Sequence, residues 1–324
     1  TLFPYTTLFR SRNFANEIWN AGRFLMMKRD QALEEAAGAP AAEFKPGFAD
    51  KWIQSRLHST IKSITIGLDR YRVDEYAKTV YDFVWRDFCD WYVEIMKGQM
   101  NECPTPAEKL ALADFAVSLY GQILMMLHPI MPFMTEEIWH ITQEKGDNDS
   151  ISTQPAPTAD EEKIDAALED KFEFLQLLIE EVRRLRSTLN LPPQQKAPIA
   201  ISTNSAEMSE FLSAQSPLIS VMARASELNI GYGLAKPASA LASVVRDQQI
   251  YLVLDGNVDL SKERERLSKE IERLERNISG TEKKLTNESF VAKAPADLVA
   301  YEREKLTSMK ESLAKVRENL QAIS

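Results

Sequence analysis

Cysteine and histidine are scarce in this chain of 324 residues, which has two cysteines and three histidines. Cys89 and Cys103 cannot supply the four ligands of a structural zinc site, and the histidines are scattered along the chain, so we expect no metal site. Free thiols are compatible with a reducing cytoplasm, which is the expected location. Cys89 lies in an aromatic helical segment, where a buried and unreactive thiol is the simpler interpretation.

Long apolar runs and catalytic motifs are missing as well. No run of about 18 apolar residues is found, so no membrane span is expected. The first ten residues have neither the basic start nor the apolar stretch of a secretory signal. There is no glycine-rich phosphate loop and no nucleophile with motif support. We therefore assign no catalytic residue.

Positive charge is in short supply overall, since the net charge is −9. From Ser261 to Ser324, however, 14 basic residues face 12 acidic ones, a net charge of +2 that leaves −11 for the rest of the chain. An acidic body is a poor non-specific ligand for nucleic acid. A slightly basic tail on such a body favours a local contact with a polyanion that depends on shape.

What the sequence does contain, first of all, is a series of apolar patterns with helical spacing between residues 12 and 145. Short breaks rich in proline and alanine separate the patterns, which is typical of a helical bundle. Its many aromatic residues are interpreted as core rather than as a stacking surface. The expected helices start at Arg12 and at Asp50 and cover Val73–Met96, Ala107–Leu127 and Thr135–Gln143.

A linker at 146–160 is followed by a segment, 161–256, that combines a helix with strands. Thr158 and Glu161 have the spacing of a capping box that would start this helix, and Pro192–Pro193 would end it. Beyond the prolines the apolar period changes to two, which predicts strands with short helices between the first two. The expected strands are Ala197–Thr203, Glu227–Tyr232, Leu241–Arg246 and Ile250–Leu254, and the helices lie near Ser205–Ala214 and Pro217–Ala223.

The tail, 257–324, carries two heptad patterns separated by a break of roughly ten residues, which predicts an antiparallel two-helix coiled coil. The first seam holds Leu267, Ile271, Leu274, Ile278, Thr281 and Leu285, and the second holds Leu306, Met309, Leu313, Val316, Leu320 and Ile323. In the register that we predict, Glu282 pairs with Arg303 and Glu275 pairs with Lys310. Exposed pairs of this kind contribute about 0–1 kcal/mol each, so they select a register more than they stabilise it.

Three groups of polar or basic residues are not required by a core, and each is a candidate for contact with phosphates and bases. One is a polar face of the first helix, one is at the end of the linker helix, and one is the outer ridge of the coiled coil, where position f is basic in four successive heptads. A solvated face is the alternative interpretation of the first-helix face and of the ridge, and hydrogen bonds within the bundle are a further alternative for the first. The candidates are Arg12, Asn16, Asn20 and Arg23; Arg183, Arg184 and Arg186; and Lys262, Arg266, Lys269, Arg273, Arg276 and Lys283.

Several segments resemble valyl-tRNA synthetases, and the resemblance is nearly continuous from Arg12 to Ser324. RNFANEIWNAGRFLMM (Arg12–Met27) resembles the first helix of that family's anticodon-binding bundle, and DFVWRDFCDWYVEIMK (Asp82–Lys97) resembles its cysteine-centred signature. LHPIMPFMTEEIW (Leu127–Trp139) is similar to the motif that closes the bundle. VRRLRSTLNLPP (Val182–Pro193) and NESFVAKAP (Asn287–Pro295) are similar to later segments, the second being the tip of the terminal coiled coil.

The resemblance implies a mainly α chain with an anticodon-binding bundle at 12–145, a linker at 146–160, a small α+β module with its linker helix at 161–256 and a tRNA-binding coiled coil at 257–324. It implies valine tRNA as partner, together with the catalytic domain of the same enzyme, and a monomer without membrane contact. Residues 1–11 match nothing in the family, and we interpret them as a foreign or disordered segment.

The family's catalytic signatures, His-Ile-Gly-His and Lys-Met-Ser-Lys-Ser, do not occur in this sequence, and neither does its editing domain. The resemblance therefore implies a chain that binds tRNA but is inactive by itself and needs no cofactor, whereas the parent ligase uses ATP and Mg²⁺. A free-standing helical scaffold whose coiled coil binds protein is the alternative.

Overall fold

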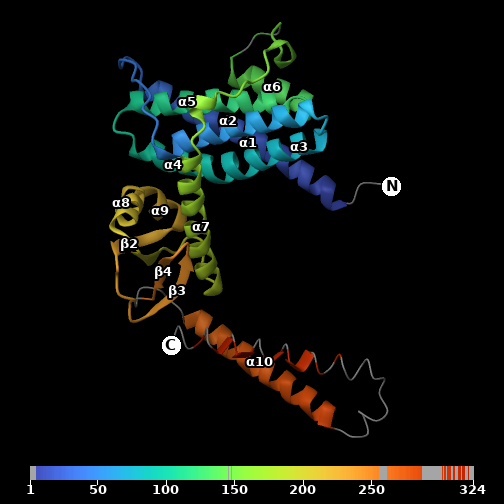
Figure 1. The fold of residues 1–324 in the computed structure, drawn as a ribbon, viewed down its shortest axis with the longest axis vertical. Coiled ribbons are helices and arrows are strands. Elements are labelled where there is room, and N and C mark those ends of the chain that lie inside the picture. The colour runs from blue at the N-terminus through green and yellow to red at the C-terminus, as the bar shows by residue number, and fades with distance from the viewer. Residues whose placement is uncertain are drawn as a thin grey trace. The chain divides into compact units, whose positions relative to one another are not determined.

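The computed structural model divides into two compact units, Thr1–Glu173 and Phe174–Ser324 (Figure 1). The residues that it describes are 5–144, 146, 148–254, 261–286, 301, 303, 305–307, 309, 310, 313, 314, 316, 317 and 320. The domain boundaries expected from the sequence differ from this division in detail and stay predictions.

The first unit is a bundle of helices. Its elements are α1 (Tyr5–Glu35), α2 (Phe48–Asp69), α3 (Val73–Asp82), the π-helix η1 (Phe83–Tyr92), α4 (Val93–Glu102), α5 (Pro106–Leu127), α6 (Pro132–Thr142) and two 3₁₀ turns, η2 (Ile151–Thr153) and η3 (Glu161–Lys163). Each expected helix is present. The helix predicted at Val73–Met96 runs on to Glu102, and its middle is π-helical, so successive side chains there are spaced differently around the axis.

The start of α1 differs from the prediction. The helix begins at Tyr5, so residues 5–11 are helical and the disorder expected for this segment is not found. Their origin outside the family stays a prediction.

Local sequence explains where several of these helices begin. Thr105 caps α5 through a reciprocal box, in which the Glu108 amide donates to the Thr105 hydroxyl at 3.3 Å and the Thr105 amide donates to the Glu108 carboxylate at 3.1 Å. Proline occupies the first turn of both α5 and α6, where its missing N–H costs nothing. The box predicted at Thr158 and Glu161 is wrong, because the carboxylate of Asp165 accepts the Leu168 amide at 2.9 Å at the start of the next helix.

Aromatic side chains fill the bundle core, as the sequence indicated. Trp52 of α2 stacks on Phe172 with ring centroids 3.6 Å apart, and Phe88 lies 5.7 Å from Tyr120. The Tyr120 hydroxyl donates to the carbonyl of Ile18 at 2.6 Å, which ties α5 to α1. Each ring therefore buries apolar area, and the buried hydroxyl still finds an acceptor.

A polar network joins α2 to the first turn of the helix that follows η3. The Glu169 carboxylate accepts hydrogen bonds from Ser55 at 2.5 Å and Ser59 at 2.8 Å, and it pairs with Arg56 at 3.0 Å. Arg56 also pairs with Asp87 at 2.9 Å. Each charged group in this partly buried region therefore has a partner of opposite charge.

One described helix, α5, is long and apolar enough to cross a membrane by length and composition, although no such run was expected from the sequence. Most of its apolar stretch is buried among the other helices of the bundle, as in the core helix of a folded domain.

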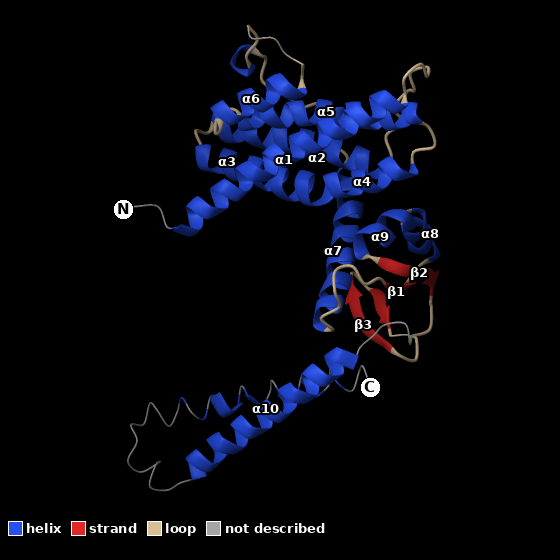
Figure 2. Cartoon of the chain, turned by 180° about the vertical axis from the view of Figure 1, so that it is seen from behind, coloured by secondary structure: helices blue, strands red, loops and turns tan. Residues whose placement is uncertain are grey.

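The second unit contains a four-stranded sheet (Figure 2). Helix α7 (Ala166–Thr188) begins in the first unit and continues into this one. The strands and helices that follow are β1 (Ala197–Thr203), α8 (Ala206–Ala214), α9 (Ser216–Ala223), β2 (Ala225–Tyr232), β3 (Ala240–Val245) and β4 (Gln248–Val253). All four predicted strands and both short helices are confirmed to within a few residues.

The strand order is β2-β1-β4-β3. The first two strands are parallel, with α8 and α9 in the connection between them, and both helices pack on β2. Strand β4 lies antiparallel to both β1 and β3, and Arg246 and Asp247 form the tight turn that joins β3 to β4, both with positive φ. The antiparallel pair thus follows a short hairpin, and the parallel pair needs a helical crossover.

The tail begins with α10 (Ser261–Thr286). The predicted seam is confirmed on this helix, where Leu267, Leu274, Ile278 and Thr281 are buried and Ile271 and Leu285 are half-buried. The described positions between 301 and 320 are helical, and Leu306, Met309, Leu313, Val316 and Leu320 are the less exposed among them. The predicted tip at 287–295 and the seam residue Ile323 lie outside the described residues.

Candidate nucleic-acid interface

The polar face predicted on the first helix is present on α1. Arg12, Asn16, Asn20 and Arg23 are all exposed, whereas Phe14, Ile18, Ala21 and Leu25 are buried against the bundle. The spacing of three and four residues puts Asn16, Asn20 and Arg23 on one side of the helix. Two amides and a guanidinium group on one exposed surface can donate to phosphates and to base edges.

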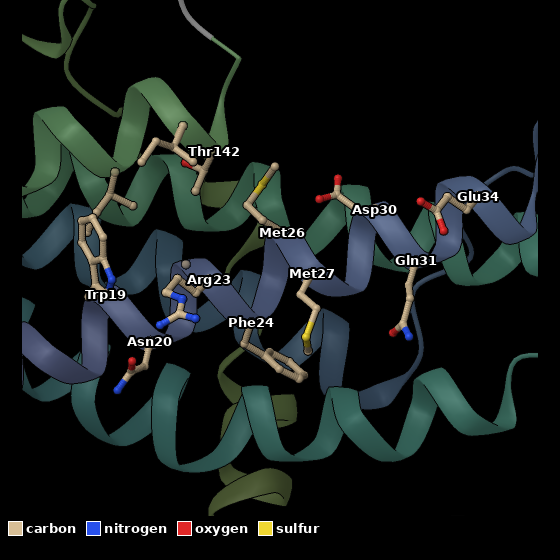
Figure 3. Close-up of a pocket in the computed structure, with 13 residues that line it drawn as sticks. Trp19, Asn20, Arg23, Phe24, Met26, Met27, Asp30, Gln31, Glu34 and Thr142 are labelled. Carbon is tan, nitrogen blue, oxygen red and sulfur yellow. The ribbon is translucent and has the colours of Figure 1, made fainter.

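A groove between α1 and α6, with a cavity volume of about 640 Å³, adjoins this face. Asn20 and Arg23 line it together with Trp19, Met27 and Ile141, whose apolar side chains are 37–52% exposed. Figure 3 shows Trp19, Asn20 and Arg23 on neighbouring turns of α1, with acidic residues farther along the same helix. An exposed indole beside an amide and a guanidinium group is suited to a planar heterocycle, which stacks on the ring and hydrogen-bonds at its edge.

The two ends of this groove carry opposite charge. Arg23 lies toward one end, and Asp30 and Glu34 line the other. From α4, the Lys97 ammonium group lies 5.2 Å from the ring centroid of Phe24, which also lines the groove. The Lys97 ammonium group is paired with the Glu94 carboxylate, so a phosphate is favoured chiefly near Arg23 and disfavoured near Asp30 and Glu34.

Sequence reasoning missed Trp19 and Ile141 as parts of this site. Trp19 directly follows Ile18 of the apolar stripe, and it is 37% exposed. Its direct neighbour Asn20 on the polar face was a signal in the sequence. Ile141 comes from α6, more than a hundred residues away, and no local pattern joins the two helices.

The three arginines of the linker helix have three different environments. Arg184 is exposed and pairs with Glu181 at 2.5 Å, and Arg183 donates to the carbonyl of Met222 at 3.1 and 3.2 Å. Arg186 is only 6% exposed and donates to the carbonyls of Gln195 at 2.5 Å, Pro192 at 3.3 Å and Arg224 at 3.5 Å. Since its donors are used inside the module, Arg186 does not fit the predicted contact with nucleic acid.

Burial also lowers the pKa of Arg186, with a further contribution from Arg224. The guanidinium group remains charged all the same, because an arginine side chain keeps its proton throughout the physiological range. It therefore acts as a fixed cationic brace for the loop that follows α7.

The basic ridge of the tail lies on the outer surface of α10. Arg266, Lys269, Arg273, Arg276 and Lys283 are exposed, and the side chain of Lys262 lies outside the described part of the helix. Lys269 pairs with Glu265 at 2.5 Å and Arg273 with Glu270 at 2.5 Å. These pairs are exposed and exchangeable, so a polyanion can compete with the helix's own carboxylates for the cations.

The ion pairs between the two tail segments correct the predicted register. Lys310 pairs with Glu282 at 2.6 Å, and Arg317 pairs with Glu275 at 2.5 Å. The expected partners, Arg303 for Glu282 and Lys310 for Glu275, are each one heptad too early. The antiparallel pairing of e positions is correct, but the second segment is displaced by seven residues.

In the part of the chain that the structure describes, neither a metal site nor a reactive cysteine is supported. No group of three or more histidine, cysteine, aspartate or glutamate side chains there could hold a metal ion. Burial raises the pKa of the Cys89 thiol to about 12, helped by Glu17 and Asp90, so the thiol is protonated and a poor nucleophile at neutral pH. Both cysteines are free.

Comparison with known proteins finds two family models, the first of which crosses the boundary between the two units and leaves out α1. A family model described as the anticodon-binding domain of tRNA ligase matches residues 50–201, and one described as the valyl tRNA synthetase tRNA binding arm matches residues 259–324. The second match contains the whole basic ridge, and the first contains most of the helical bundle and the start of the sheet module.

Curated relatives match nearly the whole chain. A valine–tRNA ligase from Chlorobaculum tepidum is 34% identical over 322 residues, which cover 97% of this chain and 35% of that protein. One from Bacillus cereus is 38% identical over 308 residues, covering 95% and 34%. One from Fusobacterium nucleatum is 32% identical over 322 residues, covering 99% and 36%. The chain therefore spans about a third of the length of the curated relatives that it matches.

Proposed function

Because the chain belongs to the valine–tRNA ligase family, we propose that it binds the tRNA that accepts valine, through the bundle and the tail together. The observation that carries this proposal is the pair of family matches, an anticodon-binding domain at 50–201 and a tRNA-binding arm at 259–324, in one chain. The exposed polar face of α1 and the basic ridge of α10 supply the chemistry that such contacts need.

In the bundle, the anticodon arm lies along α1. Arg12 and Arg23 contact phosphates, Asn16 and Asn20 contact base edges, and an unpaired base stacks on Trp19 in the groove that α6 closes. The acidic end of the groove supports this orientation, because Asp30 and Glu34 would repel a phosphate placed there. The bases therefore enter the groove and the backbone stays outside.

In the tail, the ridge of Arg266, Lys269, Arg273, Arg276 and Lys283, extended by Lys262, contacts the tRNA backbone at the outer corner of the L-shaped molecule. Cations at f recur every seven residues, or about 10 Å along the helix axis. A straight row of positive charge with that spacing can follow a phosphate backbone without reading its bases. Arg183 and Arg184 of the linker helix are further candidates for a phosphate contact.

The whole ligase attaches valine to this tRNA with ATP and Mg²⁺, in the cytoplasm and as a monomer. The contribution of this chain is to hold the tRNA. Contacts made far from the reacting centre orient the acceptor end there, and their binding energy is used in the transition state. By itself the chain should give no valine-dependent exchange of pyrophosphate into ATP.

The proposal is tested by measuring tRNA affinity at several salt concentrations. The transcript of a valine tRNA should bind with a salt dependence that weakens when four ridge cations, Lys262, Lys269, Arg276 and Lys283, are changed to Glu. The slope of log affinity against log salt should fall by about 3, since each phosphate contact contributes about 0.7–0.9. A matched control makes the same charge change at four exposed lysines away from the ridge, which are Lys45, Lys51, Lys196 and Lys236.

Binding by the bundle is tested with the same tRNA after its anticodon has been replaced. The unchanged chain should prefer the original anticodon, and the variants Trp19→Ala and Asn20→Ala should lose most of that preference while keeping the salt slope. If the ridge variant and its control bind equally well, the tail contact is wrong. If no tRNA binds above the level of an unrelated acidic protein, the proposed function fails as a whole.

A further inference from the structure

One end of the bundle exposes a set of apolar side chains that the tRNA contacts do not use. Two aromatic residues there are almost fully exposed, Tyr71 at 92% and Phe133 at 91%. Four aliphatic neighbours in the chain are between 42% and 64% exposed, namely Ile66, Leu68, Val73 and Ile130. Single exposed apolar residues are ordinary, but a group that includes two bare aromatic rings marks a surface for contact.

These residues come from two turns that lie side by side and from the helix ends next to them. The first joins α2 to α3 and the second joins α5 to α6. The Tyr76 hydroxyl in the first helical turns of α3 donates to the carbonyl of Met126 near the end of α5, at 2.7 Å. Figures 1 and 2 show both turns at the same end of the bundle, which is also the end where α1 begins. We call these six residues the apolar end.

Tyr71 has an unusual backbone as well as an exposed ring. Its φ is 57°, in the left-handed region where a helix normally ends with glycine or asparagine. A tyrosine in this conformation is strained, and its ring gains nothing from the bundle, since it is 92% exposed. Folding of the bundle alone therefore gives no reason for a tyrosine at this position.

Charge around the apolar end limits what can cover it. Asp74 and Glu75 open α3 and hold Arg72 at 3.0 and 2.9 Å, and Glu136 and Glu137 line a hollow of about 800 Å³ beside Phe133. Acidic groups on both turns, which Arg70 and Arg72 of the first turn offset only in part, disfavour a nucleic acid or an anionic lipid surface. The second turn carries no lysine or arginine, so a symmetric contact with a second copy through it would bring Glu136 and Glu137 against like charges. The suitable occupant is a protein surface with apolar residues and a basic rim.

We propose that the apolar end is the docking surface for the remainder of the ligase chain. This inference rests on the proposed function, because the covering surface belongs to the roughly two thirds of a valine–tRNA ligase that this chain does not match. Tyr71 and Phe133 insert into that surface, and basic side chains of the occupant meet Glu136 and Glu137 in the hollow. The contact fixes the bundle relative to the part of the enzyme that carries the chemistry.

The test compares the chain alone with a chimera in which it replaces the matched third of the Bacillus subtilis valine–tRNA ligase, to which it is 35% identical. Tyr71→Cys and Phe133→Cys are the probes, and Tyr232→Cys, a tyrosine that is 67% exposed on β2, is the matched control. The rate of alkylation by an uncharged maleimide is measured without tRNA. Labelling of the parent chain, which has Cys89 and Cys103, is subtracted.

Both probes should react at least tenfold more slowly in the chimera than in the chain alone, and the control should change less than twofold. Equal rates in the two proteins overturn the inference. So does protection in the chain alone that rises with its own concentration, because a second copy would then be the occupant. If the chimera does not fold, the intact Bacillus subtilis enzyme with cysteines at the aligned positions takes its place, with the same two readings.

Affinity for tRNA is measured separately on the chain alone. A chain that binds valine tRNA but whose probes stay reactive in the chimera loses this inference and keeps the proposed function. A chain that fails to bind tRNA loses the proposed function, whatever the probes report.

Discussion

Replacing Arg186 by methionine separates a structural arginine from an exposed neighbour. Methionine is unbranched and of similar length, so the change removes the guanidinium group and little packing. Arg184→Met, two residues earlier on α7, is the matched control, because Arg184 is exposed and its pair with Glu181 is local.

The size of the effect follows from the contacts. A hydrogen bond to a charged group contributes about 1.5–3 kcal/mol, and Arg186 makes one short bond, to Gln195, and two long ones, to Pro192 and Arg224. Burying the guanidinium group costs part of this gain, as its lowered pKa indicates. We expect Arg186→Met to destabilise the sheet module by about 2–4 kcal/mol and Arg184→Met by about 0–1 kcal/mol.

Tryptophan fluorescence cannot measure this difference, because all five tryptophans lie between residues 19 and 139, in the other unit. Hydrogen exchange of the amides in β1 and β2 is local and suitable. A loss of about 2.8 kcal/mol corresponds to exchange about 100-fold faster when opening limits the rate through its equilibrium. Equal acceleration by the two variants would refute the argument, since it would mean that the buried guanidinium contacts contribute no more than an exposed pair.

Three other predictions concern the tail and the bundle. A double-mutant cycle should give a coupling of about 0.2–1 kcal/mol between Glu282 and Lys310 and none between Glu282 and Arg303, as measured by thermal unfolding followed by circular dichroism. Burial lowers the pKa of the His58 imidazole, so as the pH falls the unfolded chain binds a proton at His58 before the folded chain does. The stability that neutral His58 contributes should therefore be complete above about pH 6.5 and be lost as the pH falls below that value. Tryptophan-detected melting between pH 8 and pH 5 should therefore depend less on pH in His58→Gln, and an unchanged dependence would count against the assignment. Glu169→Gln should lower the free energy of unfolding of the bundle by about 1–3 kcal/mol in urea, because the ion pair with Arg56 and the part-buried hydrogen bonds from Ser55 and Ser59 weaken together.

The regular elements were the most predictable part of the fold. The strands at 197–203 and 248–253 follow from an alternating pattern between clear turn signals, and the aromatic core of α3, η1 and α4 follows from helical spacing. These features depend on neighbours in the sequence, where periodicity contains the information. The capping box expected at Thr158 failed because two aspartates nearby compete for the same role, and spacing does not rank them.

The candidate site was only partly predictable, since its exposed residues are recognisable by type but its shape is not. Asn20 and Arg23 could be found on one helix face, whereas the groove needs Ile141 from a distant segment. Arg186 has the same sequence context as Arg184, and only the position of the loop after α7 distinguishes a buried brace from a solvated side chain.

The error in the coiled-coil register has a specific cause. Arg303, Lys310 and Arg317 are seven residues apart, so each presents a cation at the same heptad position. Charge complementarity alone therefore favours two alignments almost equally. The structure selects the alignment in which Lys310 meets Glu282.

The heptad repeat of seam residues and charges limits how the length of the tail can change in evolution. A deletion or duplication of one heptad in each helix would return every seam residue and every charge pair to an equivalent partner, while the length of the arm changed by about 10 Å. Intermediate lengths would rotate the apolar stripe away from its neighbour and lose the seam. The coiled-coil arms of related proteins should therefore differ in length by whole heptads. The distance over which an arm can contact its ligand would then change in steps of about 10 Å.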